Sequence, residues 1–220
     1  IFLSIFLYFN GEKKFIFYGI FLSISAFCNA GFSPYSDSLS RFSQNPAIIL
    51  TLSFIIILGG LGFNVMSNVY YSLHKSKRSN KQILTLHSKI VLTMTSVLIV
   101  LGTVLFYVFE RKLAFKDMSF SSAFLNAFFE SVTLRTAGFE TISQNSFSSH
   151  SSFVAKIFMI IGGSPGSMAG GIKTTTVFLM LLLAYKSAND KNFPSVFKRD
   201  ISLESIDKAT SIFIKAICFL

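Results

Sequence analysis

The sequence predicts an all-α integral membrane protein built from repeated units of a helix, a short re-entrant helix and a second helix. Hydrophobic residues make up 51% of the 220 residues and charged residues only 14%, which is too apolar for an ordinary soluble domain. Several apolar runs are long enough to enter a bilayer, and the triplet Ala-Gly-Phe directly follows two shorter runs. These observations together indicate a repeated architecture inside a membrane.

The apolar runs differ in length, and a bilayer-spanning helix needs roughly 20 residues. Residues 46–73 and 89–109 meet that requirement and are predicted to span. Residues 15–27 and 120–134 are too short and are predicted to be re-entrant helices. The two ends of the chain lie within apolar runs, so we expect an internal portion of a longer protein. The terminal runs, expected to be pieces of further spans, are residues 1–9 and 206–220.

Residues 153–185 form the longest apolar segment, and its middle is interrupted. A straight helix of these 33 residues would be about 50 Å long, whereas the hydrocarbon core is about 30 Å thick. The interruption at residues 162–176 reads GGSPGSMAGGIKTTT, which is rich in small and helix-breaking residues. The segment is therefore predicted to be bent, unwound or re-entrant at this point.

The net charge of +10 raises the question of a nucleic-acid partner. Residues 74–89 contain five Lys or Arg and no acid, and the stretch after residue 185 is also basic. Basic loops accumulate on the cytoplasmic side of membranes, so these two loops are predicted to lie inside. No basic stripe with interleaved aromatic residues is present, and no nucleic-acid binding is expected.

The chain contains an internal repeat around the Ala-Gly-Phe triplets. ISAFCNAGF at residues 24–32 aligns with SVTLRTAGF at residues 131–139, at an offset of 107 residues. Irregular backbone at membrane depth survives only inside protein or beside a water-filled cavity. A glycine there can turn successive carbonyls toward one axis, where they replace the hydration shell of a monovalent cation. The residues with this composition are Asn29, Ala30, Gly31, Thr136, Ala137 and Gly138. The alternative is a pair of ordinary helix C-terminal turns.

Two charged residues stand beside the second turn, where an unpaired charge in the membrane costs several kcal/mol. Arg135 either lines the ion path or supports the turn by pairing with Glu130 or with backbone carbonyls. Cys28 and Cys218 are far apart and belong to no Cys/His cluster, so neither a metal site nor a disulfide framework is indicated.

The motifs SISAFCNAGFS, FESVTLRTAGFETI and IIGGSPGSMAGGIKTTT resemble the membrane subunit of the Trk/Ktr/HKT superfamily of potassium-uptake proteins, of the TrkH/KtrB type. The resemblance covers nearly the whole chain. It implies four helix–pore helix–helix repeats around one pore, as in a potassium-channel-like transporter, with two of the four filter turns present here. The implied division is the second repeat at 1–73, a cytoplasmic loop at 74–88, the third repeat at 89–186, a cytoplasmic loop at 187–205 and the start of the fourth repeat at 206–220.

The resemblance also implies a role for each motif. The backbone of the six turn residues forms two quarters of a K⁺ selectivity filter. Residues 162–176 form an intramembrane loop that gates ion flow. Cys28 and Met168 stand where small polar residues are expected in relatives. The gating residues are Gly162, Gly163, Ser164, Gly166, Ser167, Gly170, Gly171 and Lys173.

The same resemblance implies a multi-pass protein of the inner (plasma) membrane, embedded in the lipid bilayer and working as a homodimer. A cytoplasmic nucleotide-binding regulatory subunit of the TrkA/KtrA type would bind the inside loops. No enzymatic activity is expected. K⁺ is the transported ion, and no cofactor is expected in this chain because nucleotide belongs to the regulatory partner.

Other interpretations stay open for the glycine-rich segment. A Walker A phosphate loop requires Lys directly after the last Gly, but Ile172 separates Gly171 from Lys173. A secondary transporter could bind a solute at a broken helix, and a Na⁺-permeable or cation-coupled member of the superfamily is a further alternative. Lys173 either holds the loop closed, repels cations, or snorkels toward the cytoplasmic interface.

Overall fold

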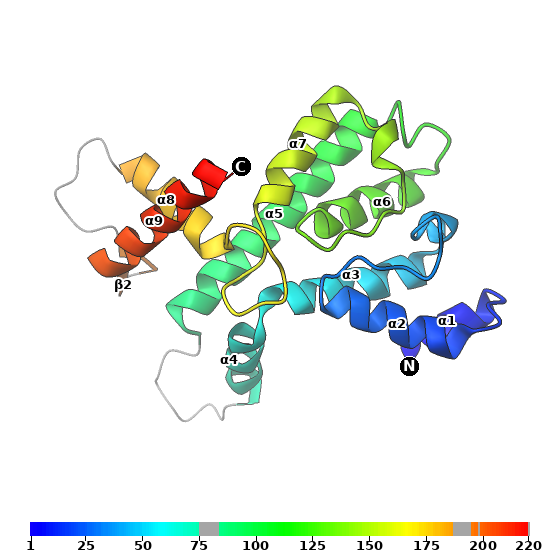
Figure 1. Ribbon diagram of the computed structural model, residues 1–220, viewed down its shortest axis with the longest axis horizontal. Coiled ribbons are helices and arrows are strands. Elements are labelled where there is room, and N and C mark those ends of the chain that lie inside the picture. The colour runs from blue at the N-terminus through cyan, green and yellow to red at the C-terminus, as the bar shows by residue number, and fades with distance from the viewer. Residues whose placement is uncertain (75–83, 187–194, 198, 220) are drawn as a thin grey trace.

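The computed structural model describes residues 1–74, 84–186, 195–197 and 199–219, and it is helical apart from one pair of two-residue strands (Figure 1). The antiparallel strands pair Ser195 with Asp200 and Val196 with Arg199. The fold is thus the all-helical one that the sequence predicts. The elements are α1 (Phe2–Phe9), α2 (Phe15–Phe27), η1 (Ser40–Phe42), α3 (Pro46–Leu61), α4 (Phe63–His74), α5 (Leu86–Glu110), α6 (Phe120–Thr133), η2 (Gln144–Ser146), α7 (Ser149–Ile160), α8 (Thr174–Lys186), β1 (Ser195–Val196), β2 (Arg199–Asp200) and α9 (Leu203–Phe219).

Several helices begin at polar residues that cap them. Asn45 precedes Pro46 and accepts a hydrogen bond from the N–H of Ile48, which fixes the start of α3. Ser119 and Ser148 cap α6 and α7 in the same way. These caps fix the starts of α3, α6 and α7 directly after a loop, so these three starts follow from local sequence.

The two predicted repeats form two groups of packed helices. In the first group α2 packs on α1 and α3, and in the second α6 and α7 pack on α5. One buried core joins Leu22, Ile49 and Leu52 of the first group to Phe129 and Phe139 of the second. A smaller core around Phe106, Phe115 and Phe158 lies within the second group. The short helix α6 is therefore buried on both sides.

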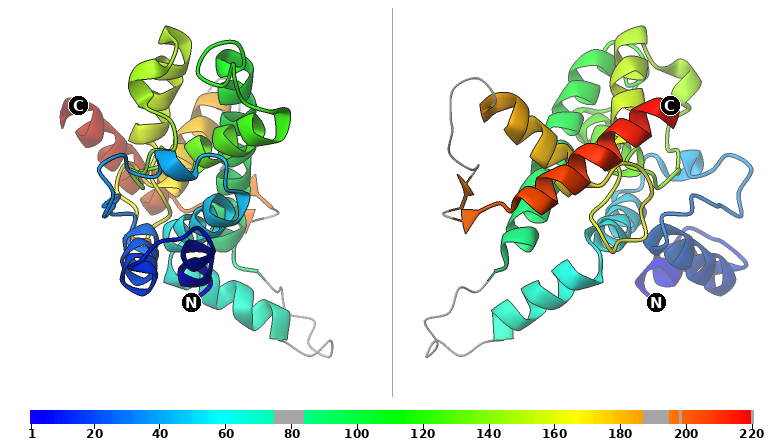
Figure 2. Two further views of the ribbon diagram at one scale, coloured as in Figure 1. Left: turned by 90° about the vertical axis from the view of Figure 1, so that its right-hand side faces the viewer. Right: turned by 60° about the vertical axis from the view of Figure 1, so that its left-hand side comes forward.

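The prediction of one spanning helix over residues 46–73 is wrong in that these residues form two helices. The helix ends at Leu61, and α4 continues at an angle of 101° to α3 (Figure 2). Gly62 forms the corner with φ of 79° and ψ of 155°, a conformation that is essentially reserved for glycine. Three glycines, Gly59, Gly60 and Gly62, stand close together here, and the sequence alone does not show that the chain turns at Gly62.

The other predicted elements agree more closely with the structure. The first re-entrant helix has the predicted bounds as α2, the second ends one residue early as α6, and residues 89–109 lie within α5. By length and composition, α5 is the one described helix that could cross a bilayer unbroken, and the bent α3–α4 pair would count as a second. Parts of the two loops predicted to be cytoplasmic, 75–83 and 187–194, lie outside the described residues.

Candidate ion-binding site

The two predicted turns have the same backbone geometry. Asn29 and Gly31 have φ of 50° and 73°, and Thr136 and Gly138 have φ of 71° and 79°. The alanine between each pair is not in this left-handed region. Alternation between the two handednesses turns successive carbonyls toward the same side of the chain, which is the arrangement that a carbonyl-lined cation site needs. Both non-glycine residues sit in a conformation that is uncommon outside functional or strained sites.

A hydroxyl near the end of each short helix closes the following turn. Ser25 Oγ donates to the carbonyl of Phe32 at 2.8 Å, and Thr133 Oγ1 donates to the carbonyl of Phe139 at 2.8 Å. The N–H of Phe139 also donates to Thr133 Oγ1 at 2.9 Å. The alignment at 107 residues places Ser25 over Val132, so the repeat did not reveal these two hydroxyls. The sequence feature that could have revealed them is a Ser or Thr five or six positions before the glycine of each turn.

The two turns lie against each other. A Cβ added to Gly31 would stand 2.7 Å from the carbonyl oxygen of Ala137, and one added to Gly138 would stand 3.3 Å from the Cα of Gly31. The structure therefore brings the six predicted turn residues into one place, although they are 107 positions apart in the sequence. Their surroundings differ, because Ala137 is fully buried whereas Ala30 is exposed among the described residues.

The predicted contact between Glu130 and Arg135 is wrong. Both side chains are buried, yet no ion pair joins them, and Arg135 makes no hydrogen bond to a backbone carbonyl within the described part of the chain. Helix α6 ends at Thr133, so Arg135 lies past the last turn and not on the face of Glu130. Side chains meet on a helix at spacings of three or four, and these two residues are five apart.

The loops beyond the turns hold each other together. The N–H of Leu39 donates to the carbonyl of Glu140 at 2.9 Å, and the N–H of Glu140 donates to Ser38 Oγ at 3.1 Å. Arg41 binds Asp37 through its Nε at 3.1 Å, and this hydrogen bond lowers the pKa of Asp37. The ion pair with Arg41 therefore fixes Asp37 within the first of these loops.

The break predicted in residues 153–185 is present, and its two ends are joined. Helix α7 stops at Ile160 and α8 begins at Thr174. Ile161 and Ile172 form a parallel bridge, in which the N–H of Ile172 donates to Ile160 O at 2.9 Å and the N–H of Gly162 donates to Ile172 O at 3.0 Å. The chain between them is a compact loop with closed ends, of the Ω type. We call residues 161–173 the loop from here on.

The loop binds the end of α3. The N–H of Ser164 donates to Gly60 O at 3.0 Å, the N–H of Met168 donates to Gly59 O at 3.2 Å, and Ser164 Oγ donates to Leu61 O. The last four carbonyls of a helix lack partners within it. Because the corner at Gly62 stops α3, these carbonyls become available to a segment more than 100 residues away.

The loop also touches the second turn. The N–H of Gly170 donates to Thr136 Oγ1 at 3.0 Å. Lys173 Nζ donates to Ala169 O at 2.7 Å, so this lysine ties the loop to itself. The loop therefore has one polar contact with the candidate cation site and several with α3.

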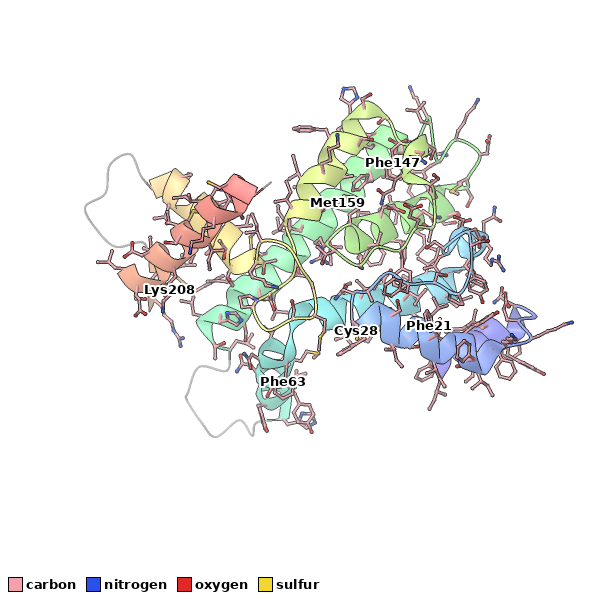
Figure 3. All side chains as sticks on the ribbon, in the orientation of Figure 1. Phe21, Cys28, Phe63, Phe147, Met159 and Lys208 are labelled. Carbon is pink, nitrogen blue, oxygen red and sulfur yellow. The ribbon has the colours of Figure 1, made fainter. Side chains whose placement is uncertain are left out.

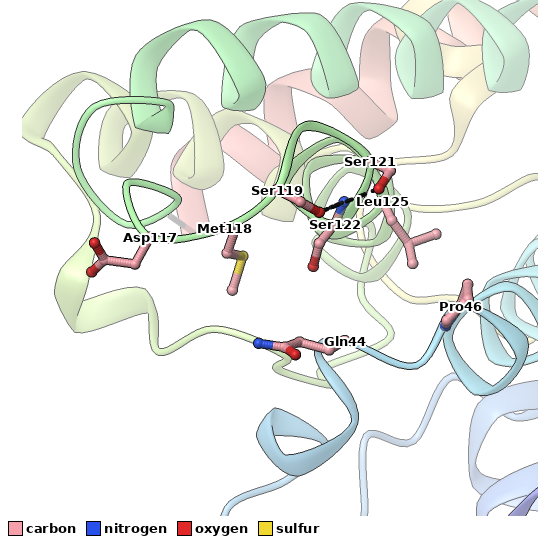
Figure 4. Close-up of a pocket in the computed structure, with 8 residues that line it drawn as sticks. All are labelled: Gln44, Pro46, Asp117, Met118, Ser119, Ser121, Ser122 and Leu125. Atoms are coloured by element: carbon pink, nitrogen blue, oxygen red, sulfur yellow. Dashed lines mark hydrogen bonds between the residues drawn. The ribbon is translucent and has the colours of Figure 1, made fainter.

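One further pocket lies away from all of these residues. Figure 4 shows this pocket of about 450 Å³ between the start of α3 and the start of α6, with Gln44 on one side and Asp117 and Met118 on the other. Ser119 and Ser121 lie 3.3 Å apart through their hydroxyls at its edge. None of the predicted site residues lines it.

Two short helices that end in matched, touching glycine turns, together with a helix broken by a closed loop, define a membrane ion-transport architecture of repeated pore units. Residues 5–220 match the family described as "TrkH: Cation transport protein". The chain belongs to this family of cation transport proteins.

The similar proteins agree with this assignment. The chain is 37% identical over 204 residues to "Potassium/sodium uptake protein NtpJ" of Enterococcus hirae, a match that covers 92% of the chain and 44% of that protein. It is 34% identical over 206 residues to "Ktr system potassium uptake protein B" of Vibrio alginolyticus, covering 93% of the chain and 44% of that protein. The crystal structure of the potassium transporter TrkH from Vibrio parahaemolyticus superposes with a TM-score of 0.76 at 20% sequence identity. The match covers 96% of the chain and 44% of that protein. This structural likeness shows the fold. The chain spans less than half the length of these relatives.

Proposed function

We propose that this chain contributes two filter turns and a gating loop to a potassium uptake path across the inner membrane. The observation that carries the proposal is the shared geometry of Asn29-Ala30-Gly31 and Thr136-Ala137-Gly138, which are in mutual contact. The backbone carbonyls of these six residues would coordinate dehydrated K⁺. The hydrogen bond between the N–H of Gly170 and Thr136 Oγ1 supports the proposal that the loop obstructs ions that leave the turns.

The filter assignment is tested by Gly31→Ser and Gly138→Ser in the complete transporter. At Gly31 the added Cβ would meet the carbonyl oxygen of Ala137 at 2.7 Å, and its φ of +73° disfavours any side chain. We expect growth of a potassium-uptake-deficient bacterium at low K⁺ to fail and the preference for K⁺ over Na⁺ to fall. Gly11→Ser is the matched control, because Gly11 has φ of +79° and nothing within 4 Å. Unchanged ion preference in both filter variants would reject the assignment.

The gating role is tested by deletion of residues 166–171. The deletion retains Ile161 and Ile172, the two residues that form the bridge. We expect a higher rate of Rb⁺ entry into vesicles if the loop is the main barrier. A rate that stays the same or falls would reject the loop as that barrier.

The assembly of the complete transporter is part of the proposal. We infer a multi-pass homodimer that binds a cytoplasmic regulatory subunit of the TrkA/KtrA type, and nucleotide is expected on that subunit alone. Relatives of the chain named as Ktr system uptake proteins support a multi-component system. A Na⁺-permeable transporter is the second candidate, since one similar protein is named for potassium and sodium uptake. Comparison of Na⁺ and K⁺ flux through the unmodified protein distinguishes the two.

A further inference from the structure

A groove of about 440 Å³ lies between the loop and the first turns of three helices. His87 comes from the start of α5, Thr176 from the start of α8, and Lys208 from the second turn of α9. Pro165 and Lys173 close the side toward the loop. In the right view of Figure 2, α9 passes beside both the loop and α8, and the two helices are in contact. None of the six turn residues lines this groove.

The electrostatics of the groove favour an anion. Two lysines, Lys173 and Lys208, line it, and His87 adds a hydrogen-bonding imidazole. The acid next to them is Glu204, which is already bound to Lys208. Each helix start adds roughly half a positive charge from its backbone dipole, and three helix starts line the same groove.

One polar atom at the groove is buried without a partner. The Nε2 atom of His87 makes no hydrogen bond among the described residues. Thr176 is only 5% exposed and lines the same groove, where its hydroxyl can donate to a bound acceptor. Buried polar groups are normally satisfied, so the unsatisfied nitrogen beside this hydroxyl points to a ligand that forms hydrogen bonds.

The rest of the groove is apolar and extends further. Ile90, Leu179 and Ile212 line the groove beside the polar groups. A second hollow of about 640 Å³, lined by Met159 and Ile172, shares Lys173 and Ile212 with the first. Figure 3 places Met159 at the end of α7 and Lys208 on α9, and each of these residues lines one of the two hollows. A hydrophilic anion alone would leave this apolar surface uncovered.

We propose that the groove binds an acidic phospholipid of the inner leaflet. The lipid phosphate would lie among His87, Thr176 and Lys208, and an acyl chain would occupy the hollow toward Met159. Helices α5 and α9 begin within the last residues of the two loops predicted to be cytoplasmic, and that prediction would put the basic end at the inner surface. Acidic lipids are attracted to basic residues at that surface.

Native mass spectrometry of the complete transporter in detergent tests this proposal, with phosphatidylglycerol and phosphatidylcholine of equal chain length as probes. We expect preferential binding of phosphatidylglycerol. The double variant His87→Gln/Lys208→Gln should weaken it by roughly tenfold, because one cationic group and one hydrogen-bonding imidazole are lost. Lys215→Gln is the matched control, since Lys215 is exposed on the same helix and does not line either hollow. Thr176→Val, which keeps the side-chain shape, should weaken binding several-fold. This variant is measured in place of the double variant if the latter does not fold.

Three results would overturn the proposal. Equal binding of the two lipids would show that the anionic headgroup is not recognised. Equal losses of binding in the double variant and in Lys215→Gln would show that the groove is not the binding site. Full displacement of phosphatidylglycerol by inorganic phosphate would show that the groove binds a free anion. None of these readouts depends on potassium flux, so they are independent of the proposed transport function.

Discussion

The second helices of the two repeats are both interrupted, but in opposite ways. Helix α3 is separated from α4 by Gly62 alone and turns through 101°, whereas α7 and α8 are separated by the loop of residues 161–173. The short interruption leaves carbonyls without partners at the end of α3, and the long one supplies the N–H groups and the hydroxyl that bind them. The two breaks are therefore complementary parts of one contact.

A glycine corner that ends one helix can therefore provide free carbonyl groups that bind a distant segment of the chain. An unbroken helix over residues 46–73 would use the carbonyls of Gly59, Gly60 and Leu61 internally. The loop would then lose its principal polar contacts, which are those with the end of α3. The four predictions that follow alter one side of the contact at a time, in the complete protein.

The largest effect is expected from Gly162→Ala. An added Cβ would stand 1.6 Å from the carbonyl oxygen of Gly170, which is backbone and cannot swing aside. The loop could not close on its bridge, and we expect a loss of about 3 kcal/mol or more, the upper range for overpacking. Thermal unfolding of the detergent-solubilised protein measures this loss. Gly60→Ala is the control, because its Cβ would meet nothing within 4 Å. A melting temperature equal to that of the control would contradict the close approach.

Gly62→Ala should be the next most damaging change. The corner conformation costs an alanine about 1–3 kcal/mol, and its Cβ would also stand 2.9 Å from the backbone of Gly166. We expect reduced stability together with faster Rb⁺ leak, because the loop loses its binding surface. Gly11→Ala separates the two causes, since Gly11 has the same φ of +79° but no neighbour within 4 Å. Equal leak in both variants would show that backbone strain alone explains the result.

Ser164→Ala tests a single hydrogen bond across the contact. Its hydroxyl donates to Leu61 O, and removal of a typical hydrogen bond costs about 1 kcal/mol. The expected result is a small drop in melting temperature with a modest rise in leak. The hydroxyl of Ser167, in the same loop, is buried without a partner, so Ser167→Ala should be neutral or slightly stabilising. The hydrogen bond would be unimportant if the two variants behaved alike.

The smallest effect is expected from Thr136→Val. This change keeps the side-chain shape but removes the acceptor for the N–H of Gly170, which costs at most about 1 kcal/mol. Thr136→Ser retains the hydroxyl and should preserve the contact. A rise in Rb⁺ leak in the valine variant alone would link the loop to the second turn, and identical leak in the two variants would contradict that link.

The sequence predicted elements whose signals are local. The bounds of α2 follow from an apolar run between polar neighbours, and the break at residues 162–176 follows from its glycines and proline. The paired turns were predicted because two copies repeat the same triplet, and their positive φ values agree with that expectation.

The unpredicted features depend on contacts between distant segments. Gly62 looks like any glycine in an apolar helix, and only the loop bound beside it explains the corner. The Glu130–Arg135 pair was expected from proximity in sequence, whereas the end of α6 at Thr133 separates the two side chains. The groove beside His87 and Lys208 joins residues about 120 positions apart, and no local pattern marks it.

The loop is held to α3 and to the second turn by few bonds. Within the described residues, four hydrogen bonds make these two contacts: two backbone bonds and one hydroxyl bond to α3, and one bond to Thr136. At about 1 kcal/mol each, their loss amounts to about 4 kcal/mol, which corresponds to roughly one released loop in a thousand at equilibrium. To reverse that population, the proposed regulatory partner would have to favour the released loop by about 8 kcal/mol, twice the strength of the four bonds.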